Sequence, residues 1–218
     1  MLQEILPDML ASTEMFILDQ RDITDQDAHK NYFAYADHND PALRAKFHEN
    51  ALHYSGCRYL FGRYLEDRSF FLAGSHIARE GRTLHLGIDL FCVDQEVVSA
   101  PCDGEIVVSA KEAGAHGYGN YLILRPDDSK LPYIFMGHLS DDKVGLGRVE
   151  AGQQIARLGH WDNYENGGWS VHLHLQLLRE PPRTGEAPIG YTSRVELEAN
   201  RQNFPDPRSL YPGWVVKR

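Results

Sequence analysis

The sequence predicts a mainly β protein, built as an antiparallel sandwich or barrel-like sheet with a helical extension before it. From about residue 58, short apolar runs rich in β-branched and aromatic residues alternate with Gly, Pro and Asp. Helical periodicity is absent from that stretch. Before about residue 55 the apolar residues recur instead at spacings of three and four, with few β-branched residues.

The first 57 residues are expected to form the helical extension. Segments 25–35 and 41–54 carry the helical spacing of apolar residues. The tripeptide Asn39-Asp40-Pro41 is a helix-start signal, with Asp40 as the N-cap and Pro41 at the first helical position.

Residues 58–180 are expected to form the β-domain, and residues 181–218 an irregular tail packed on its core. Turn signals such as Pro-Cys-Asp-Gly separate the predicted strands, and six prolines argue against regular structure in the tail. The predicted strands are residues 84–91, 104–110, 120–126, 132–140, 154–159 and 171–178.

Composition excludes some classes of function. A formal net charge of −9 argues against nucleic acid as a partner, because binding phosphates requires a basic face. No run of apolar residues is long enough for a membrane span. Three cysteines without metal-type spacing predict reduced thiols, and the N-terminus lacks the pattern of a secretory signal, so we expect a cytoplasmic protein. The sequence does not indicate an oligomeric state.

Two predicted strands each place polar side chains on one face. In the run from His85 to Asp89, alternation directs both side chains to the same side, with Gly87 between them leaving room for a shared ligand. In the second strand His172 and His174 share a face in the same way. Polar faces on otherwise apolar strands are unfavourable unless they bind something.

These residue types favour zinc chemistry. His85, Asp89 and His174 supply the nitrogen and oxygen ligands that zinc accepts, and they leave a fourth position for water. The sequence contains no H-E-x-x-H helix to provide a glutamate base. Histidine is the natural substitute, because its pKa lies near neutrality.

The order of the motifs HLGID, APCDGEIV, GYGNYLIL, GHLS, AGQQIARLG and HLHLQ resembles the lysostaphin/LytM-type zinc metallopeptidases, over residues 60–178. The resemblance implies a duplicated-hybrid-motif fold, hydrolysis of peptide bonds in peptidoglycan, and Zn²⁺ bound by His85, Asp89 and His174. It further implies that His138 and His172 line the cleft. We assign His172 as general base and His138 as the stabiliser of the tetrahedral intermediate.

The resemblance also suggests where a peptide or peptidoglycan-like substrate would bind. Tyr118 and Asn120 are candidates for substrate contact, with turn formation as the alternative. We expect the groove to be flanked by loops 141–147 and 161–169. The aromatic residues Trp161, Tyr164 and Trp169 would form its wall or pack the second loop.

The sequence departs from the family pattern at two places. Loop 159–170 is longer, aromatic and acidic, and Gln176 stands where a carboxylate is common. Because of these departures, the resemblance does not establish peptidoglycan as the substrate. An N-terminal asparagine placed on the metal would make the enzyme latent, and Asn31, Asn39 and Asn50 are candidates.

Two other functions compete with a peptidase. One is a catalytically silent zinc-binding domain that recognises peptides or cell-wall fragments. The other is a phosphoryl carrier of the glucose-permease IIA type, suggested by the β-architecture and the AGQQIARLG stretch. That carrier uses two histidines and needs neither Asp89 nor the His172–His174 pair, so the ligand set disfavours it.

Overall fold

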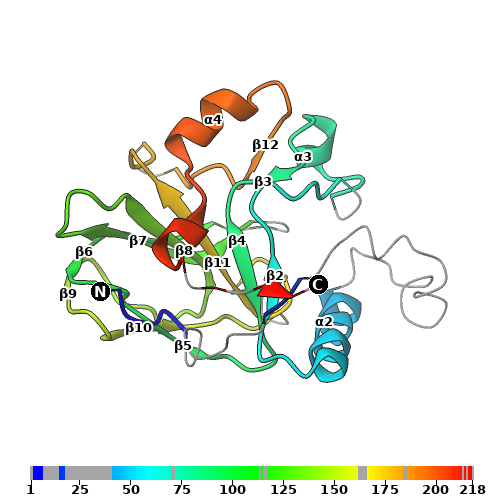
Figure 1. Cartoon of the computed structure of the whole chain (residues 1–218), viewed down its shortest axis with the longest axis horizontal. Helices are drawn as coiled ribbons and strands as arrows, with labels where there is room; N and C mark the ends of the chain where they lie inside the picture. The colour runs from blue at the N-terminus through cyan, green and yellow to red at the C-terminus, as the bar shows by residue number, and fades with distance from the viewer. Residues whose placement is uncertain are drawn as a thin grey trace.

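A single large sheet organises the chain. The computed structural model describes residues 2–6, 15–17, 41–69, 72–112, 114, 117–161, 166–183, 186–212, 214 and 216–217. Within them, nine strands form one sheet in the order β13-β1-β2-β4-β11-β8-β7-β6-β9 (Figure 1). Neighbouring strands are antiparallel, except that β1 runs parallel to both of its neighbours. The strands are β1 (Met15–Ile17), β2 (Leu60–Gly62), β4 (Ile88–Phe91), β6 (Gly104–Glu112), β7 (Gly119–Pro126), β8 (Tyr133–Leu139), β9 (Gly147–Val149), β11 (His172–Leu178) and β13 (Val216–Lys217).

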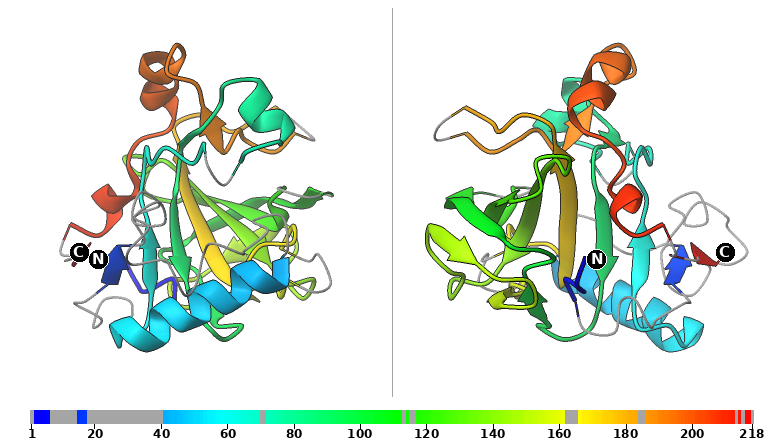
Figure 2. Two further views of the ribbon diagram at one scale, coloured as in Figure 1. Left: turned by 90° about the vertical axis from the view of Figure 1, so that its right-hand side faces the viewer. Right: turned by 60° about the vertical axis from the view of Figure 1, so that its left-hand side comes forward.

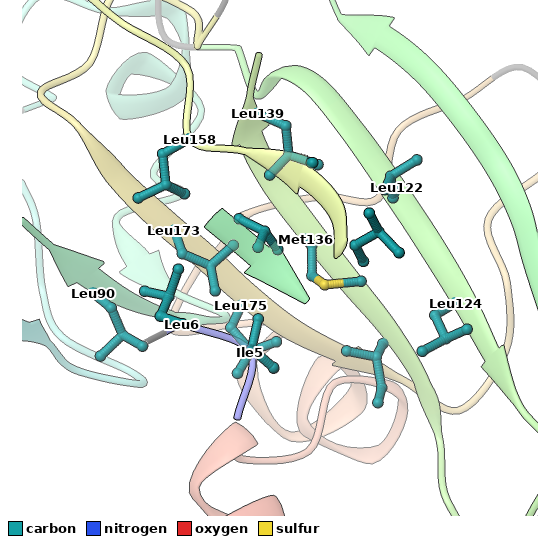
Figure 3. Close-up of a cluster of buried hydrophobic side chains, with 14 of the residues drawn as sticks. Ile5, Leu6, Leu90, Leu122, Leu124, Met136, Leu139, Leu158, Leu173 and Leu175 are labelled. Atoms are coloured by element: carbon teal, nitrogen blue, oxygen red, sulfur yellow. The ribbon is translucent and has the colours of Figure 1, made fainter. Parts of the chain in front are cut away.

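A smaller sheet packs against the large one and encloses the core. It consists of β5 (Val97–Ser99) and β10 (Gln154–Arg157). Val98 and Ile155 belong to the same buried cluster as Leu122, Met136 and Leu173 of the large sheet (Figure 3). The alternation of apolar residues along the strands directs these side chains to one face. The core therefore lies between the two sheets.

The helices lie at opposite ends of the molecule. Helix α2 (Pro41–Ser55) lies at one end, where Leu52 packs against Leu60 and Phe91. At the other end lie α3 (His76–Arg79), α4 (Leu197–Asn203) and the two-stranded sheet of β3 (Leu84–His85) and β12 (Tyr191–Thr192) (Figures 1 and 2). A 3-10 helix, η1 (Pro207–Leu210), follows α4.

The predicted fold class is confirmed: the protein is mainly β and antiparallel, with an N-terminal helix. Five of the six predicted strands match β6, β7, β8, β10 and β11 to within a few residues. The predicted helix at 41–54 is α2. The predicted helix at 25–35 and the N-cap Asp40 lie outside the described residues, as do Asn31 and Asn39.

The predicted strand 84–91 is wrong as a single element. It is divided into β3 and β4, which pair with different partners, because Tyr191 pairs with His85 whereas His174 pairs with Asp89. Leu86 packs in a second cluster with Phe135, separate from the main core that the following residues join. Alternation therefore fails across residues 86 and 87.

The two ends of the chain contain more regular structure than the sequence predicts. The extension of residues 1–57 is not helical throughout, because β1 adds a parallel strand to β2. The tail of residues 181–218 is not irregular throughout, because it contains α4, η1, β12 and β13. Helix α4 forms in the proline-free interval between Pro188 and Pro205, where nothing interrupts the backbone hydrogen bonds.

Candidate metal centre

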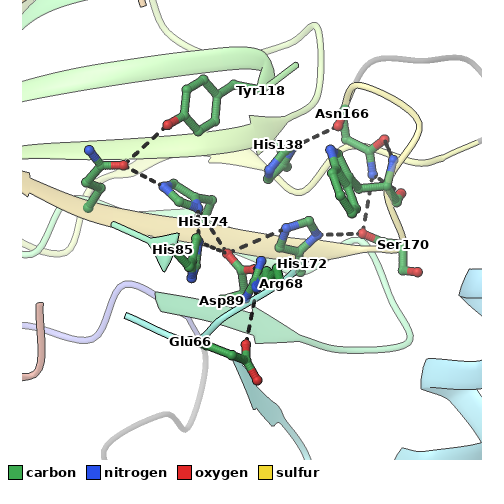
Figure 4. A network of polar contacts seen from close by, with 12 residues as sticks. Glu66, Arg68, His85, Asp89, Tyr118, His138, Asn166, Ser170, His172 and His174 are labelled. Atoms are coloured by element: carbon green, nitrogen blue, oxygen red, sulfur yellow. Dashed lines mark hydrogen bonds and ion pairs between the residues drawn. The ribbon is translucent and has the colours of Figure 1, made fainter. Parts of the chain in front are cut away.

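Strand β11 brings the polar residues together because it lies between β4 and β8. Its His174 faces Asp89 of β4 on one side and Gly137 of β8 on the other. His85 comes from the end of β3, and a hydrogen bond from the Leu86 amide to the Gly190 carbonyl holds that segment in place. Four separate elements thus meet at one point (Figure 4).

Three side chains converge on a point that could hold a cation. Oδ1 of Asp89 lies 3.0 Å from Nδ1 of His174 and 3.5 Å from Nε2 of His85. Those two nitrogens are 3.1 Å apart. Within the described part of the chain these residues form a group whose ligand atoms all lie within 4.8 Å of one another. All three side chains are almost completely buried.

The other nitrogen of each ring is held by a fixed acceptor. Nδ1 of His85 lies 3.1 Å from the Arg63 carbonyl, and Nε2 of His174 lies 2.9 Å from Oε1 of Gln176. Carbonyl oxygens only accept hydrogen bonds, so each ring donates there and its second nitrogen presents a lone pair. The lone pairs of His85 and His174 and the oxygen of Asp89 would repel one another without a cation among them. The residues present therefore fit a metal ion.

Gly87 makes room for this arrangement. A Cβ atom at residue 87 would lie 2.5 Å from Cε1 of His174 and 2.8 Å from the Leu175 carbonyl oxygen. No ordinary contact is so short, so a side chain here would displace the imidazole. The expected role of Gly87 as a residue that leaves the ligand space open agrees with this geometry.

His138 and His172 lie beside the three converging residues. Their ring centroids are 4.2 Å apart, and Nε2 of His172 is 3.7 Å from Oδ1 of Asp89. Nδ1 of His138 lies 2.7 Å from the Asn166 carbonyl, and Nδ1 of His172 lies 2.7 Å from the Ser170 carbonyl. Each ring donates through Nδ1, so its Nε2 carries a lone pair.

The protonation states suit both metal binding and proton acceptance. Burial lowers the pKa of His172 to about 4, although Asp89 opposes the shift. Burial, with the neighbouring charges, also holds the pKa values of His85 and His138 well below the usual range. Burial alone would raise the pKa of Asp89, but Arg68 and the surrounding imidazoles hold it well below its usual range. These three histidines are therefore neutral and the carboxylate is ionised near pH 7.

A buried ion pair holds the second oxygen of Asp89. Nη1 of Arg68 lies 2.6 Å from Oδ2 of Asp89, and Nε of Arg68 lies 3.2 Å from Oε2 of Glu66. All three side chains are nearly inaccessible to solvent. Gly62 gives the guanidinium its space, since a Cβ there would lie 2.6 Å from Nη2 of Arg68. Oδ1 is left facing the imidazoles.

The site opens into a cavity of about 450 Å³. Its lining includes Trp169, His138 and His172. It also includes His76, Ile77 and Arg82, and the segment of residues 187–191 that follows β11 in the chain. Tyr118 and Glu112 also line the cavity.

The cavity separates the two candidates for substrate contact. Tyr118 lines it, but Asn120 does not. The Asn120 amide donates to Asp141 over 2.7 Å and accepts from Lys143 over 2.9 Å, so it holds the loop after β8. Substrate contact by Asn120 stays a prediction, and in this structure its amide is engaged by the loop after β8.

The expected flanking loops are only partly correct. Trp169 lines the cavity, but none of residues 141–147 does, because Asn120 holds that loop against β7. Trp161 is not a lining residue either; its ring lies 5.4 Å from that of His160. Tyr164 lies outside the described residues, and Asn50 lies on α2 and is not a lining residue.

Sequence reasoning missed Arg68 and the wall of residues 187–191. Arg68 lies in a loop after β2, where no periodic pattern marks it. The wall reaches the site through β12 pairing with β3, a long-range contact that local patterns do not contain. The sequence gave a weak indication that Gln176 belongs to the site. This residue stands where a carboxylate is common, two positions after His174 on the same strand face.

A buried His-Asp-His group with two further histidines, at the base of a cavity on an antiparallel sheet, defines a metal-binding site of the hydrolytic enzyme type. Residues 83–186 match Peptidase family M23. This part of the chain is an M23 peptidase domain, and it contains the three converging residues together with His138 and His172.

Solved structures of peptidases resemble the chain. The catalytic domain of the antimicrobial peptidase lysostaphin from Staphylococcus simulans is 22% identical, with 72% of this chain and 97% of that chain covered and a TM-score of 0.42. A zinc-containing peptidase from Vibrio cholerae is 28% identical, with 49% of this chain and 31% of that chain covered and a TM-score of 0.36. A mutant of the catalytic domain of the prophage-encoded M23 protein EnpA from Enterococcus faecalis is 21% identical, with 50% of this chain and 75% of that chain covered and a TM-score of 0.38. Superpositions at these scores define neither substrate nor mechanism.

No curated protein matches the sequence significantly. In the part of the chain that the structure describes, no helix has the length and apolar character needed to cross a membrane.

Proposed function

We propose that this chain is a zinc-dependent endopeptidase that hydrolyses a peptide bond in the cavity beside Asp89. One observation carries the proposal. The acceptor atoms of His85, Asp89 and His174 face one another at 3.0–3.5 Å, although the hydrogen-bond partners of both rings leave lone pairs there. A divalent cation resolves the repulsion and uses all three as ligands.

Zinc suits this donor set better than calcium or magnesium, which prefer oxygen ligands. Two imidazole nitrogens and one carboxylate oxygen would hold it and leave a further position free. When bound, zinc supplies a Lewis acid that makes water nucleophilic near neutral pH and polarises the scissile carbonyl.

His172 is the better placed residue to accept a proton. Its Nε2 carries a lone pair, lies 3.7 Å from Oδ1 of Asp89, and so stands next to the expected metal position. Its lowered pKa keeps the ring neutral, as a general base requires. Once protonated, the same nitrogen can donate to the departing amine.

His138 would assist only in a protonated form. Its Nδ1 is committed to the Asn166 carbonyl, so stabilising a developing oxyanion requires a proton on Nε2. The ring lies 4.2 Å from that of His172, and two imidazolium ions at that distance would repel. We infer that at most one of the two rings carries an additional proton, on Nε2, at any time during turnover.

The cavity supports a peptide as substrate. A volume of about 450 Å³ accommodates a few residues of an extended chain. Its walls combine the aromatic rings of Tyr118 and Trp169 with the charged groups of Glu112 and Arg82. We propose a short peptide or a peptidoglycan-like fragment.

Metal analysis combined with a substrate screen tests the proposal. The protein is purified without added zinc, and its metal content is compared with that of His85→Ala and His172→Ala. All three are then assayed by mass spectrometry on peptidoglycan fragments, glycine-rich peptides and D-amino-acid dipeptides. We expect one zinc per wild-type chain, its loss in His85→Ala, and its retention in His172→Ala with turnover reduced about a hundredfold or more.

Three outcomes would contradict parts of this proposal. Folded wild-type protein that binds no zinc would exclude the metal centre. Full activity of His172→Ala would exclude that residue as the base. Bound zinc with no turnover on any of the three substrate classes would favour the silent binding domain.

A further inference from the structure

The side-chain amide of Gln176 connects the candidate metal centre to the cavity wall. This residue is completely buried on β11. Its Oε1 lies 2.9 Å from Nε2 of His174 and accepts a hydrogen bond from the Tyr118 hydroxyl over 3.3 Å. Its Nε2 donates to the Ile189 carbonyl over 3.0 Å. Figure 4 labels His174 and Tyr118, the two partners of Oε1, within the site.

Each of these hydrogen bonds has a determined direction. The Ile189 carbonyl can only accept, so the NH₂ group of Gln176 must point to it and Oε1 must point to His174. Because Oε1 also only accepts, His174 must carry a proton on Nε2. Nδ1 of His174 is then the nitrogen that faces Asp89, 3.0 Å away.

The other end of the connection is the wall of residues 187–191. Gly190 accepts a hydrogen bond from the Leu86 amide, and Tyr191 pairs with His85. A Cβ on Gly190 would lie 2.5 Å from the Tyr118 hydroxyl oxygen, so the backbone of this wall packs closely against the Tyr118 side chain. Gln176 is the side chain that joins the wall to His174.

We propose that Gln176 is a positioning residue, which fixes the coordinating nitrogen of His174 and holds the substrate-facing wall of residues 187–191 in register with it. The part that concerns coordination rests on the proposed metal centre. The part that concerns the Nε2 proton and the wall does not. A peptide lying along the wall would thereby be placed at a constant distance from the metal position.

Three variants of the full chain test this proposal. Gln176→Met keeps the length of the side chain but removes every hydrogen bond. Gln176→Glu keeps an acceptor for His174. Tyr118→Phe is the matched control, because it removes one donor to the same Oε1 and leaves the other two contacts of Gln176 in place.

The readouts include two that need no metal. On chelator-treated protein, ¹⁵N NMR detects the slowly exchanging Nε2 proton of His174, and hydrogen exchange reports the backbone amides of residues 186–192. Zinc affinity is measured by competition with a chelator. Thermal unfolding confirms that each variant is folded.

In Gln176→Met we expect loss of the slow Nε2 proton, exchange of residues 186–192 faster by about tenfold, and zinc affinity weaker by about 10- to 100-fold. Gln176→Glu should restore the Nε2 proton and bring zinc affinity back to within about threefold of wild type. Tyr118→Phe should leave all three readouts close to wild type.

The proposal is overturned if folded Gln176→Met keeps the slow proton and the wild-type exchange rates. It is also overturned if Tyr118→Phe changes these readouts as much as Gln176→Met does. A wild-type protein that binds no zinc would refute the proposed function instead, and the NMR and exchange results would still decide the role of Gln176.

Discussion

The two faces of β11 are equally buried but chemically opposite. Leu173, Leu175 and Leu177 point into the main core, where they pack in a cluster of buried apolar residues. His172, His174 and Gln176 alternate with them and point into the candidate site. All six side chains are exposed by 3% or less.

Burial alone therefore does not distinguish a core from a site. What differs is how specific the partners are. A leucine is stabilised by any close apolar neighbour, whereas each polar side chain here has an identified hydrogen-bond partner, such as the Ser170 carbonyl for His172 and the Ile189 carbonyl for Gln176. We expect changes on the apolar face to alter stability and changes on the polar face to alter metal binding.

The largest effect is expected when Asp89 is replaced. This residue lies on β4, beside the polar face of β11. Asp89→Ala removes a proposed ligand and leaves the buried Arg68 without its closest anion. We expect loss of bound zinc and activity, and a fall of about 3–5 kcal/mol in the free energy of unfolding. Zinc analysis and urea denaturation measure the two effects.

Asp89→Asn is the matched control for that change. It keeps the volume and one oxygen for Arg68, so packing is preserved while the charge is lost. Zinc retention at wild-type affinity in this variant would show that the carboxylate charge is not needed for binding.

On the apolar face, Leu175→Ala should destabilise the protein without affecting the metal. Leu175 is fully buried in the main cluster, and truncation leaves a cavity there. We expect a loss of about 3 kcal/mol in the free energy of unfolding, with one zinc still bound per chain. A variant that loses zinc while it remains folded would contradict the separation of the two faces.

The polar face should make the metal-free protein sensitive to acid. The pKa of His172 falls from 6.5 in the unfolded chain to about 4 in the folded one. Above pH 6.5 the ring is neutral in both states, so its contribution to stability is constant. Below pH 6.5 the unfolded chain binds the proton first, and stability falls.

For His172 alone the loss between pH 6.5 and 5 is about 2 kcal/mol. The lowered pKa values of His85 and His138 act in the same direction. Asp89 contributes outside this window, because its stabilisation is lost only as pH falls below 3.8. Urea denaturation of chelator-treated protein at several pH values measures the slope, and His172→Gln should reduce it. Stability that is flat or rises toward pH 5 would contradict the burial of neutral histidines.

The smallest effect is expected at Asn120, which lies outside the cavity. Asn120→Ala loses the hydrogen bonds to Asp141 and Lys143, so we expect about 1 kcal/mol of destabilisation. The Michaelis constant of any substrate that the wild type cleaves should change by less than about twofold. A large increase in that constant would instead support substrate contact by Asn120.

Local patterns predicted the parts of the fold and site that depend on local geometry. The alternation of histidine and leucine in β11 gave the shared face of His172 and His174. The same reasoning failed for residues 84–91, where Leu86 and Gly87 leave the strand so that β3 can pair with β12. His85 still reaches the site, but through this pairing rather than through alternation.

The remaining features depend on contacts between distant segments. Arg68 reaches Asp89 from a loop 21 residues earlier, and Gln176 reaches Ile189 across the cavity. Neither contact leaves a periodic trace in the sequence. The cytoplasmic location, the domain boundaries at 57 and 180, and the roles of the site residues stay predictions.

The backbone at His138 indicates what the site requires of the sheet. Its φ angle is 62°, in the left-handed region that favours glycine, and a non-glycine residue there is disfavoured by about 1–2 kcal/mol. The ladder between β7 and β8 shifts register close by, between Asn120 and Leu122. A sequence selected only for thermal stability would carry glycine at this position. Laboratory selection for heat resistance without selection for activity should therefore replace this histidine early. Retention of His138 in a variant would then indicate that the variant has been selected for its chemistry.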